Sequence, residues 1–416
     1  MSANEKNTEI CVIIGASHGG VNCATALRRE GWEGQIILFD ADPVMPYHKP
    51  PLSKAYLTSE DGIDKNQLKS EESYAKENIS LNLGVTVAEI QPENKTIVLS
   101  DGTVQAYTKL VIATGARPII PPIPGLDKAK NVFPLRTAQN VSDIRNFMQT
   151  SAQKRVVVIG GGYIGLETAA SLKKLGAEVV VLERESRILA RVTAPEMSTF
   201  FHDLHHNHGV EVLTRKNVTA IENQGDTNQV ICGDGSSYTA DLLIIGVGIF
   251  VNKELAEKAN LTIENGILVD ETARTSDANI YAIGDCTYHF NPHYNRNIRL
   301  ESVQNAVDQS KVAAAAICGK QPVYDSIPWF WSDQYDIKLQ MVGLSQGYNQ
   351  IVLRQEETPN SFSVWYFQDD TLLSVDAVNN AKAYVIGTKS IKEGKIINKE
   401  KLKDTSIPLK LDTILA

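Results

Sequence analysis

Two glycine-rich turns carry the strongest chemical signal in the sequence. The first reads Gly15-Ala16-Ser17-His18-Gly19-Gly20, and the second, Gly160-Gly161-Gly162-Tyr163-Ile164-Gly165, is a complete Gly-x-Gly-x-x-Gly. Glycines at this spacing permit a tight turn, let a phosphate approach the backbone and let a helix pack against the preceding strand. Because the N–H groups at such a helix N-terminus bind anions, each turn predicts a pyrophosphate site. In the first turn, Ser17 occupies the second glycine position.

Both turns lie in the strand–turn–helix context that this fingerprint needs. The apolar residues 9–14 predict a strand before the first turn, and helical spacing follows as far as Gly31. Residues 155–159 predict the strand before the second turn, and the helix that follows ends at Gly176, a C′ glycine.

An acid closes the next predicted strand in each case. Asp40 lies 20 residues beyond Gly20, and Glu183 ends the strand at residues 178–182. An acid here binds the ribose 2′-hydroxyl and repels a 2′-phosphate, which favours NADH over NADPH, although the adjacent Arg184 leaves NADPH open. Two dinucleotide sites indicate one diffusible nicotinamide and one resident flavin, since two nicotinamides would have little to exchange.

Six further motifs accompany the turns, at residues 46–54, 113–118, 191–196, 281–285, 301–306 and 329–334. Together they resemble the FAD-dependent pyridine nucleotide-disulfide oxidoreductases, specifically the oxygenase-coupled ferredoxin reductases of the putidaredoxin and rubredoxin reductase type. The resemblance covers nearly the whole chain. It implies an α/β fold with two doubly wound, glutathione-reductase-like dinucleotide-binding domains and a C-terminal α+β domain.

The expected domains are a discontinuous FAD-binding domain at 1–118 and 249–326, an NAD-binding domain at 119–248 and a C-terminal domain at 327–416. In the last domain, four segments read as strands and residues 379–402 as more helical; the strands are 337–342, 350–354, 361–367 and 372–378.

The resemblance also implies site residues. Those expected around FAD are Gly15, Ser17, Gly19, Gly20, Asp40, Asp42, Lys49, Lys54, Val87, Ala113, Gly115, Arg136, Gly284, Asp285, Val303 and Trp331. Those expected around NAD are Gly160, Gly162, Tyr163, Ile164, Gly165, Glu167, Glu183, Arg191, Gly248 and Glu301.

Two of these expectations concern acids. The family places its FAD-ribose acid at the position of Ala41, which Asp40 and Asp42 flank, so the acid that reaches the ribose stays open. Lys54 and Glu167 are expected to form a catalytic ion pair beside flavin N5. Paired in this way, Lys54 stays charged and stabilises negative charge on the reduced flavin.

Cysteine usage excludes a thiol relay. The chain has five cysteines, none within the motif at 46–54 where related disulfide reductases carry a redox pair, and no Cys-x-x-Cys. No iron–sulfur spacing is present either, so the acceptor cluster belongs to another chain. His202 and His206 lie one helical turn apart without a third ligand, and no metal site is predicted.

The expected function is an NADH-dependent FAD reductase that passes single electrons to a 2Fe–2S ferredoxin, or to rubredoxin, which feeds an oxygenase or hydroxylase. Alternatives are a monodehydroascorbate-type or NADH oxidase-type flavoenzyme with a small acceptor, and a flavoprotein whose redox state regulates partner binding.

Bulk properties agree with this function. A net charge of −8 argues against nucleic acid, and no stretch of apolar residues is long enough to span a membrane. The polar start lacks a signal peptide, so we expect a cytoplasmic protein. Seven lysines between Lys382 and Lys403 form a basic segment expected to steer an acidic ferredoxin.

Overall fold

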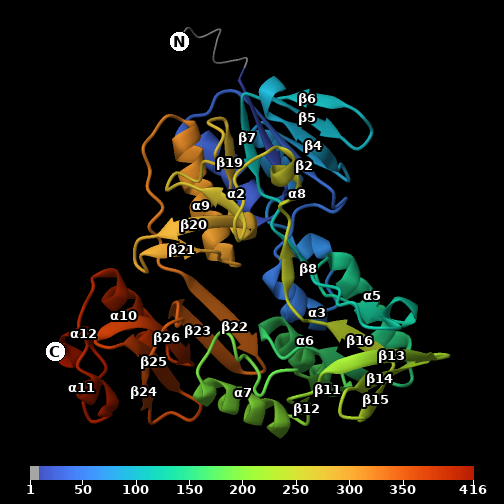
Figure 1. Cartoon of the computed structure of the whole chain (residues 1–416), viewed down its shortest axis with the longest axis vertical. Helices are drawn as coiled ribbons and strands as arrows, with labels where there is room; N and C mark the ends of the chain where they lie inside the picture. Colours follow the sequence, from blue (N-terminus) through green and yellow to red (C-terminus); the bar gives the residue numbers. More distant parts are fainter. Residues whose placement is uncertain (1–8) are drawn as a thin grey trace. The chain divides into compact units, whose positions relative to one another are not determined.

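The computed structural model describes residues 9–416, which divide between two compact units. The first unit runs to Lys49 and then comprises Asp61–Arg117 and Phe250–Pro328. The second unit comprises Pro50–Glu60, Pro118–Ile249 and Trp329–Ala416. Figure 1 shows the helices and strands of both.

The first unit is built on a parallel five-stranded sheet in the order β19-β7-β1-β2-β3. Its strands are β1 (Ile10–Ile14), β2 (Gln35–Asp40), β3 (Ile79–Leu83), β7 (Lys109–Ile112) and β19 (Ile280–Ala282). The central strand β1 is almost wholly buried, as expected for a parallel strand covered on both faces. Helices α2 (His18–Glu30) and α9 (Val303–Ile317) pack against each other.

Smaller elements complete the first unit. They are β4 (Val87–Gln91), β5 (Thr96–Leu99), β6 (Val104–Ala106), β18 (Ile267–Val269), β20 (Thr287–Asn291), β21 (Arg296–Ile298), α4 (Glu71–Lys76) and α8 (Glu254–Lys258). The chain leaves this unit through β8 (Ala116–Pro118) and returns through β17 (Ile249–Val251).

The second unit repeats the same sheet design. Its parallel sheet has the order β12-β11-β10-β16-β9, with strands β9 (Val132–Phe133), β10 (Arg155–Ile159), β11 (Glu178–Leu182), β12 (Glu211–Leu213) and β16 (Leu242–Ile245). The helices here are α3 (Ala55–Thr58), α5 (Ala138–Thr150), α6 (Tyr163–Lys174) and α7 (Pro195–Asn207), and the antiparallel strands are β13 (Val218–Gln224), β14 (Thr227–Cys232) and β15 (Ser237–Ala240).

The C-terminal part of the second unit is an antiparallel sheet, drawn in orange to red in Figure 1. Its order is β22-β23-β26-β25-β24, formed by β22 (Trp329–Gln334), β23 (Ile337–Gly343), β24 (Gln350–Gln355), β25 (Phe362–Gln368) and β26 (Thr371–Val378). Helices α10 (Ala381–Lys392), α11 (Lys399–Lys403) and α12 (Leu411–Ile414) follow. The strands and the helical segment predicted here are confirmed.

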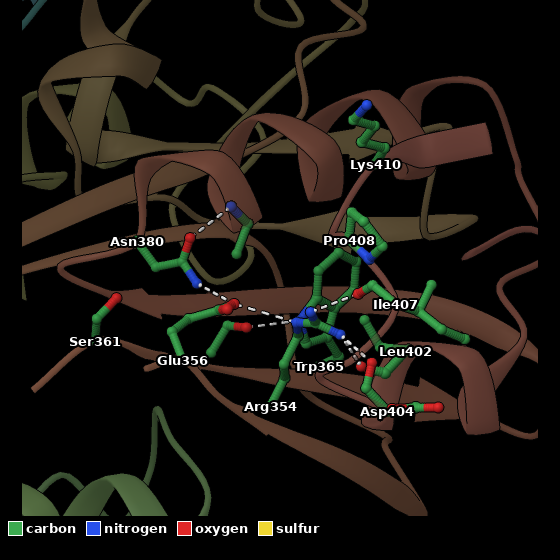
Figure 2. Close-up of polar contacts among 12 residues, drawn as sticks. Arg354, Glu356, Ser361, Trp365, Asn380, Leu402, Asp404, Ile407, Pro408 and Lys410 are labelled. Atoms are coloured by element: carbon green, nitrogen blue, oxygen red, sulfur yellow. Dashed lines mark hydrogen bonds and ion pairs between the residues drawn. The ribbon is translucent and has the colours of Figure 1, made fainter. Parts of the chain in front are cut away.

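A buried arginine attaches the last helices to this sheet (Figure 2). Arg354 is only 2% exposed, and its Nε donates to the Glu356 carboxylate at 3.1 Å. The rest of its guanidinium donates to three backbone carbonyl oxygens, those of Leu402, Asp404 and Ile407. The charge is therefore both paired and hydrogen-bonded, as a buried cation requires.

The predicted fold class is confirmed: two doubly wound sheets and a C-terminal α+β region are present. The three predicted domains stay a prediction. The second unit contains the segments assigned to the NAD-binding and C-terminal domains and also Pro50–Glu60, which the sequence placed with FAD. Within residues 9–416, no helix is both long and apolar enough to cross a membrane.

Candidate functional site

The first turn connects β1 to α2 through two tightly packed glycines. Gly15 has φ +105°, and a Cβ on it would lie 2.3 Å from the Ala113 carbonyl oxygen. A Cβ on Gly20 would lie 1.8 Å from the Gly15 carbonyl oxygen. Only glycine fits at both positions, because the helix lies directly against the strand and the turn.

The second turn connects β10 to α6 with nearly the same geometry. Gly160 has φ +111°, and its Cβ would lie 2.3 Å from the Gly246 carbonyl oxygen. A Cβ on Gly165 would lie 2.1 Å from the Gly160 carbonyl oxygen. The two turns therefore match at their first and last glycines.

The acids at the ends of β2 and β11 close both turns in the same way. Asp40 accepts from the N–H of Ala16 at 2.5 Å and from the N–H of Asp42 at 2.8 Å. Glu183 accepts from the N–H of Gly161 at 2.7 Å and from that of Glu185 at 2.8 Å. Each carboxylate therefore lies beside the turn that would hold a pyrophosphate.

Asp42 is bound differently. Its carboxylate accepts from the N–H of Val44 at 3.1 Å and from the Tyr47 hydroxyl at 2.9 Å. Because Asp40 occupies the position of Glu183, this geometry favours Asp40 as the ribose acid, and Asp42 then holds the loop that carries Tyr47.

Both turns fit a dinucleotide. Among the described residues, Ser17 at the N-cap of α2 makes no side-chain capping bond, and no atom lies within 4 Å of a Cβ built on Gly162 at the N-cap of α6. Neither α2 nor α6 has an acidic residue in its first helical turn. The positive N-terminal end of each helix is therefore suited to phosphate. A hollow beside the first turn is lined by Ala16, Ser17, Asp40, Asp42, Val44, Pro46, Tyr47, Lys49 and Leu83.

The predicted ion pair is present in the second unit. Lys54 Nζ lies 2.7 Å from Glu167 Oε2, with the lysine side chain 15% exposed and the glutamate side chain fully buried. The hydroxyls of Ser53 and Ser332 each donate to the same carboxylate at 2.6 Å. Burial raises the pKa of Glu167, and the ammonium group and the hydroxyl donors act against that rise.

The remaining predicted FAD residues are divided between the units. Gly19, Lys49, Val87, Ala113, Gly115, Gly284, Asp285 and Val303 belong to the first unit, whereas Lys54, Arg136 and Trp331 belong to the second. Gly284 has φ +81° and donates its N–H to Gln309 Oε1 at 2.7 Å, so Gln309 holds the turn that carries Asp285.

Most of the predicted NAD residues surround the second turn. Ile164 and Arg191 are exposed, and the Tyr163 hydroxyl donates to Met341 Sδ at 2.9 Å. Gly248 has φ +117° and accepts from the N–H of Ile119 at 3.0 Å. Glu301 is the exception, because it belongs to the first unit, where it pairs with Arg299.

Sequence reasoning missed Ser53, Ser332 and Gln309. Ser53 and Ser332 lie inside recognised motifs, but their approach to Glu167 depends on tertiary packing. Gln309 carried no signal, because a glutamine on a helix has no motif of its own.

Neither thiols nor metals add to the site. All five cysteines are free, and burial raises the pKa of Cys286 to about 11 and that of Cys23 to about 12. These thiols are therefore poor nucleophiles at neutral pH. Within residues 9–416, no group of three side chains could hold a metal ion.

The basic segment is partly neutralised. Lys389 and Lys395 both lie near Glu393, at 3.9 and 3.5 Å, and Lys399 pairs with Asp370 at 3.1 Å. Its positive charge is therefore smaller than the lysine count suggested.

Comparison with known proteins identifies the family. Residues 10–310 match the model described as pyridine nucleotide-disulphide oxidoreductase, and residues 329–411 match the reductase C-terminal model. The chain belongs to the pyridine nucleotide-disulphide oxidoreductase family. As a member, it is an oxidoreductase that uses FAD and a nicotinamide dinucleotide.

Its relatives in this family include electron-transfer reductases. Putidaredoxin reductase of Pseudomonas putida is 42% identical, covering 99% of this chain and 97% of its own length. A ferredoxin–NAD(P)(+) reductase from a Sphingomonas species is 39% identical, covering 96% of each, and rubredoxin–NAD(+) reductases are further relatives. The structure of a covalent putidaredoxin reductase–putidaredoxin complex superposes with a TM-score of 0.93 at 41% identity, covering 97% of each chain.

Proposed function

We propose that this protein is an NADH:ferredoxin oxidoreductase that passes electrons one at a time to a 2Fe–2S ferredoxin, which in turn feeds an oxygenase or hydroxylase. The observation that carries the proposal is the pair of similar dinucleotide turns in a chain whose five cysteines are all free, four of them buried. Without a redox thiol pair, electrons leave the flavin directly. Relatives named for putidaredoxin and ferredoxin support the same acceptor class.

The chain supplies binding and orientation, and FAD, when bound, accepts a hydride and releases electrons singly. The first turn and Asp40 would hold the FAD pyrophosphate and ribose, and Asp285 would hold a ribityl hydroxyl. The second turn holds the NADH pyrophosphate at the N-terminus of α6. Open helix N-termini with an acid beside them support the binding of a dinucleotide at each turn.

Lys54 and Glu167 are the proposed catalytic residues. Glu167 is fixed by two hydroxyls, so its carboxylate holds the Lys54 ammonium in one position. Lys54 also donates to the Pro50 carbonyl oxygen at 3.3 Å. A positive charge fixed in this way stabilises negative charge that develops during hydride transfer, without reorganisation at that moment.

Glu183 and Arg184 bear on the choice of nicotinamide. Glu183 accepts from the N–H of Gly161 in the second turn, where an acid would bind the ribose, and Arg184 pairs with Glu185 at 3.1 Å on the protein surface. Because that pairing draws the guanidinium toward another carboxylate, Arg184 is less available to a 2′-phosphate. We therefore propose a preference for NADH over NADPH.

Rubredoxin is the second candidate acceptor, because rubredoxin–NAD(+) reductases are among the relatives. We also propose a cytoplasmic location, supported by the free cysteines.

The test mixes the purified holoprotein with NADH, cytochrome c and a 2Fe–2S ferredoxin. Cytochrome c reduction should be slow until ferredoxin is added, and a parallel arm with rubredoxin ranks the two carriers. The stimulated rate should fall as salt rises to about 0.15 M, where the Debye length is about 8 Å. Equal reduction of cytochrome c or oxygen without any carrier contradicts the proposal.

A further inference from the structure

One face of the C-terminal sheet makes hydrogen bonds to the part of the second unit that contains the second turn, and three of them concern that turn, its helix and the loop beside it. Ser332 donates to Glu167, Met341 accepts from the Tyr163 hydroxyl, and Tyr366 accepts from the N–H of Ala194 at 2.9 Å. The strand registers place all three sheet residues on the same face, because directly paired residues and residues two apart share a face. The first contact supports the ion pair, whereas the third has no role in the mechanism above.

The third contact anchors the loop at residues 185–194, between β11 and α7. This loop lies against the second turn: the N–H of Leu189 donates to the Gly161 carbonyl oxygen at 3.0 Å. A Cβ on Gly161 would lie 2.7 Å from Ile188 Cγ2. Leu189 itself has φ +54°, a left-handed conformation that a leucine adopts only when its surroundings hold it there. The loop is therefore one wall of the proposed NADH pyrophosphate site, and it carries Arg191.

Two buried side chains hold the end of this loop. The N–H of Ala194 donates to the Tyr366 hydroxyl, which itself donates to Asp376 Oδ2 at 2.5 Å. Ala194 and Tyr366 are 0% exposed and Asp376 is 2% exposed. A buried backbone N–H needs an acceptor. Because the Tyr366 hydroxyl donates its hydrogen to Asp376, its oxygen is oriented to accept from the N–H of Ala194.

We propose that Tyr366 and Asp376 are positioning residues for NADH, which fix the loop at residues 185–194 against Gly161 and thereby set the affinity of the second turn. This inference rests on the proposed function of that turn as the NADH site. It assigns the C-terminal sheet a part in nicotinamide binding.

The surroundings of Asp376 make this anchor sensitive to pH. Its neighbours on this face are Tyr366 from β25, Tyr163 from α6 and the Met341 thioether from β23. Helix α10 covers the opposite face, where a Cβ on Gly387 would touch Val375. Burial raises the pKa of Asp376 to about 7, and the bond from Tyr366 opposes that rise. The ionised carboxylate accepts more strongly than the neutral acid, so the loop is held less firmly as the pH falls through about 7.

The test measures NAD⁺ affinity by titration and the KM for NADH on FAD-loaded protein between pH 6 and pH 8.5. Tyr366→Phe removes the acceptor and should raise both constants about threefold to tenfold, with kcat at saturating NADH and FAD content unchanged. In the unsubstituted protein, the KM for NADH should rise below about pH 7. Asp376→Asn keeps an acceptor for Tyr366 and should give a flat pH profile.

Tyr348→Phe is the matched control, because its ring packs 5.2 Å from that of Tyr366 while its hydroxyl stands outside this chain of bonds. It should leave both constants unchanged. An unchanged NAD⁺ affinity in Tyr366→Phe overturns the inference, as does a rise in KM that accompanies loss of FAD. If Tyr366→Phe does not fold, the pH profile of Asp376→Asn decides alone. Failure of the unsubstituted protein to bind NADH would instead refute the proposed function.

Discussion

The first and second glycine-rich turns have similar backbone geometry, but the helices that follow them carry different side chains. Each begins with a glycine at positive φ and ends with a glycine packed against the carbonyl oxygen of the first. In each, an acid accepts from an N–H of the turn and from the N–H of the residue two places after the acid. Among the positions that differ, one in the following helix carries a charge in only one of the two halves. Asn22 on α2 donates to the His18 carbonyl oxygen of its own helix, whereas the equivalent Glu167 on α6 is buried and holds Lys54.

Under the proposed function, this difference adds a fixed charge to a binding turn that both halves share. The turn alone binds a dinucleotide, through backbone groups and one acid. Fixed charge for the reaction comes only with the second helix, together with segments that pack on it from Pro50–Glu60 and from the C-terminal sheet.

The largest expected effect comes from replacing the last glycine of each turn. Gly20→Ala and Gly165→Ala should each destabilise the protein by more than about 4 kcal/mol or prevent folding, since the new Cβ meets backbone at 1.8 and 2.1 Å. Gly162→Ala should cost less than about 1 kcal/mol, because the space around it is open. Chemical denaturation measures the free energy of unfolding of all three variants. If alanine is tolerated at only one of Gly20 and Gly165, the two turns are not equivalent.

The second expected effect is the pH-dependent contribution of Asp376, in the second unit, to stability. An acid whose pKa is raised by folding keeps its proton after the unfolded chain has lost it, so it lowers stability as the pH rises from about 4 to about 7. The slope is at most about 1.4 kcal/mol per pH unit. Asp376→Asn should therefore become more stable relative to the unsubstituted protein across this window. A constant difference in unfolding free energy would show that Asp376 is ionised throughout.

The third expected effect is on flavin reduction and comes from the ion pair of Lys54 with Glu167. Lys54→Ala should slow flavin reduction by NADH about 10- to 100-fold in stopped-flow measurements at saturating NADH, because a fixed positive charge is lost. FAD content should change little. Asn22→Ala, at the equivalent position on α2, is the control and should alter the rate less than about twofold. Reduction of Lys54→Ala at the unsubstituted rate would mean that the pair is structural only.

The smallest of these effects concerns dinucleotide preference and comes from the acids beside the two turns, Glu183 and Asp40. Glu183→Gln should lower the ratio of kcat/KM for NADH to that for NADPH about tenfold, since the repulsion of a 2′-phosphate is lost. Asp40→Asn should weaken FAD retention and leave the ratio unchanged. A matched fall in the ratio for both variants would contradict the assignment of a different dinucleotide to each turn.

The sequence predicted the parts that depend on local pattern. Both turns, their strands and helices, and the ion pair of Lys54 with Glu167 are present as expected. The hydroxyl of Ser332 on Glu167 and that of Tyr366 on Asp376 were not predicted, because they join residues far apart in the chain through packing. The sequence left the choice between Asp40 and Asp42 open. The structure supports Asp40, whose carboxylate accepts from the N–H of Ala16 in the turn.

The central claim, that the first turn holds FAD and the second holds NADH, is tested most directly at the two equivalent N-cap positions, Ser17 and Gly162. The measurement is the FAD-to-protein ratio of purified Ser17→Val and Gly162→Val. A valine side chain blocks the approach of a phosphate to the turn that carries it. The account predicts a low ratio for Ser17→Val and a full ratio for Gly162→Val, which should lose only NADH binding. Full FAD in Ser17→Val together with loss of FAD in Gly162→Val would contradict it.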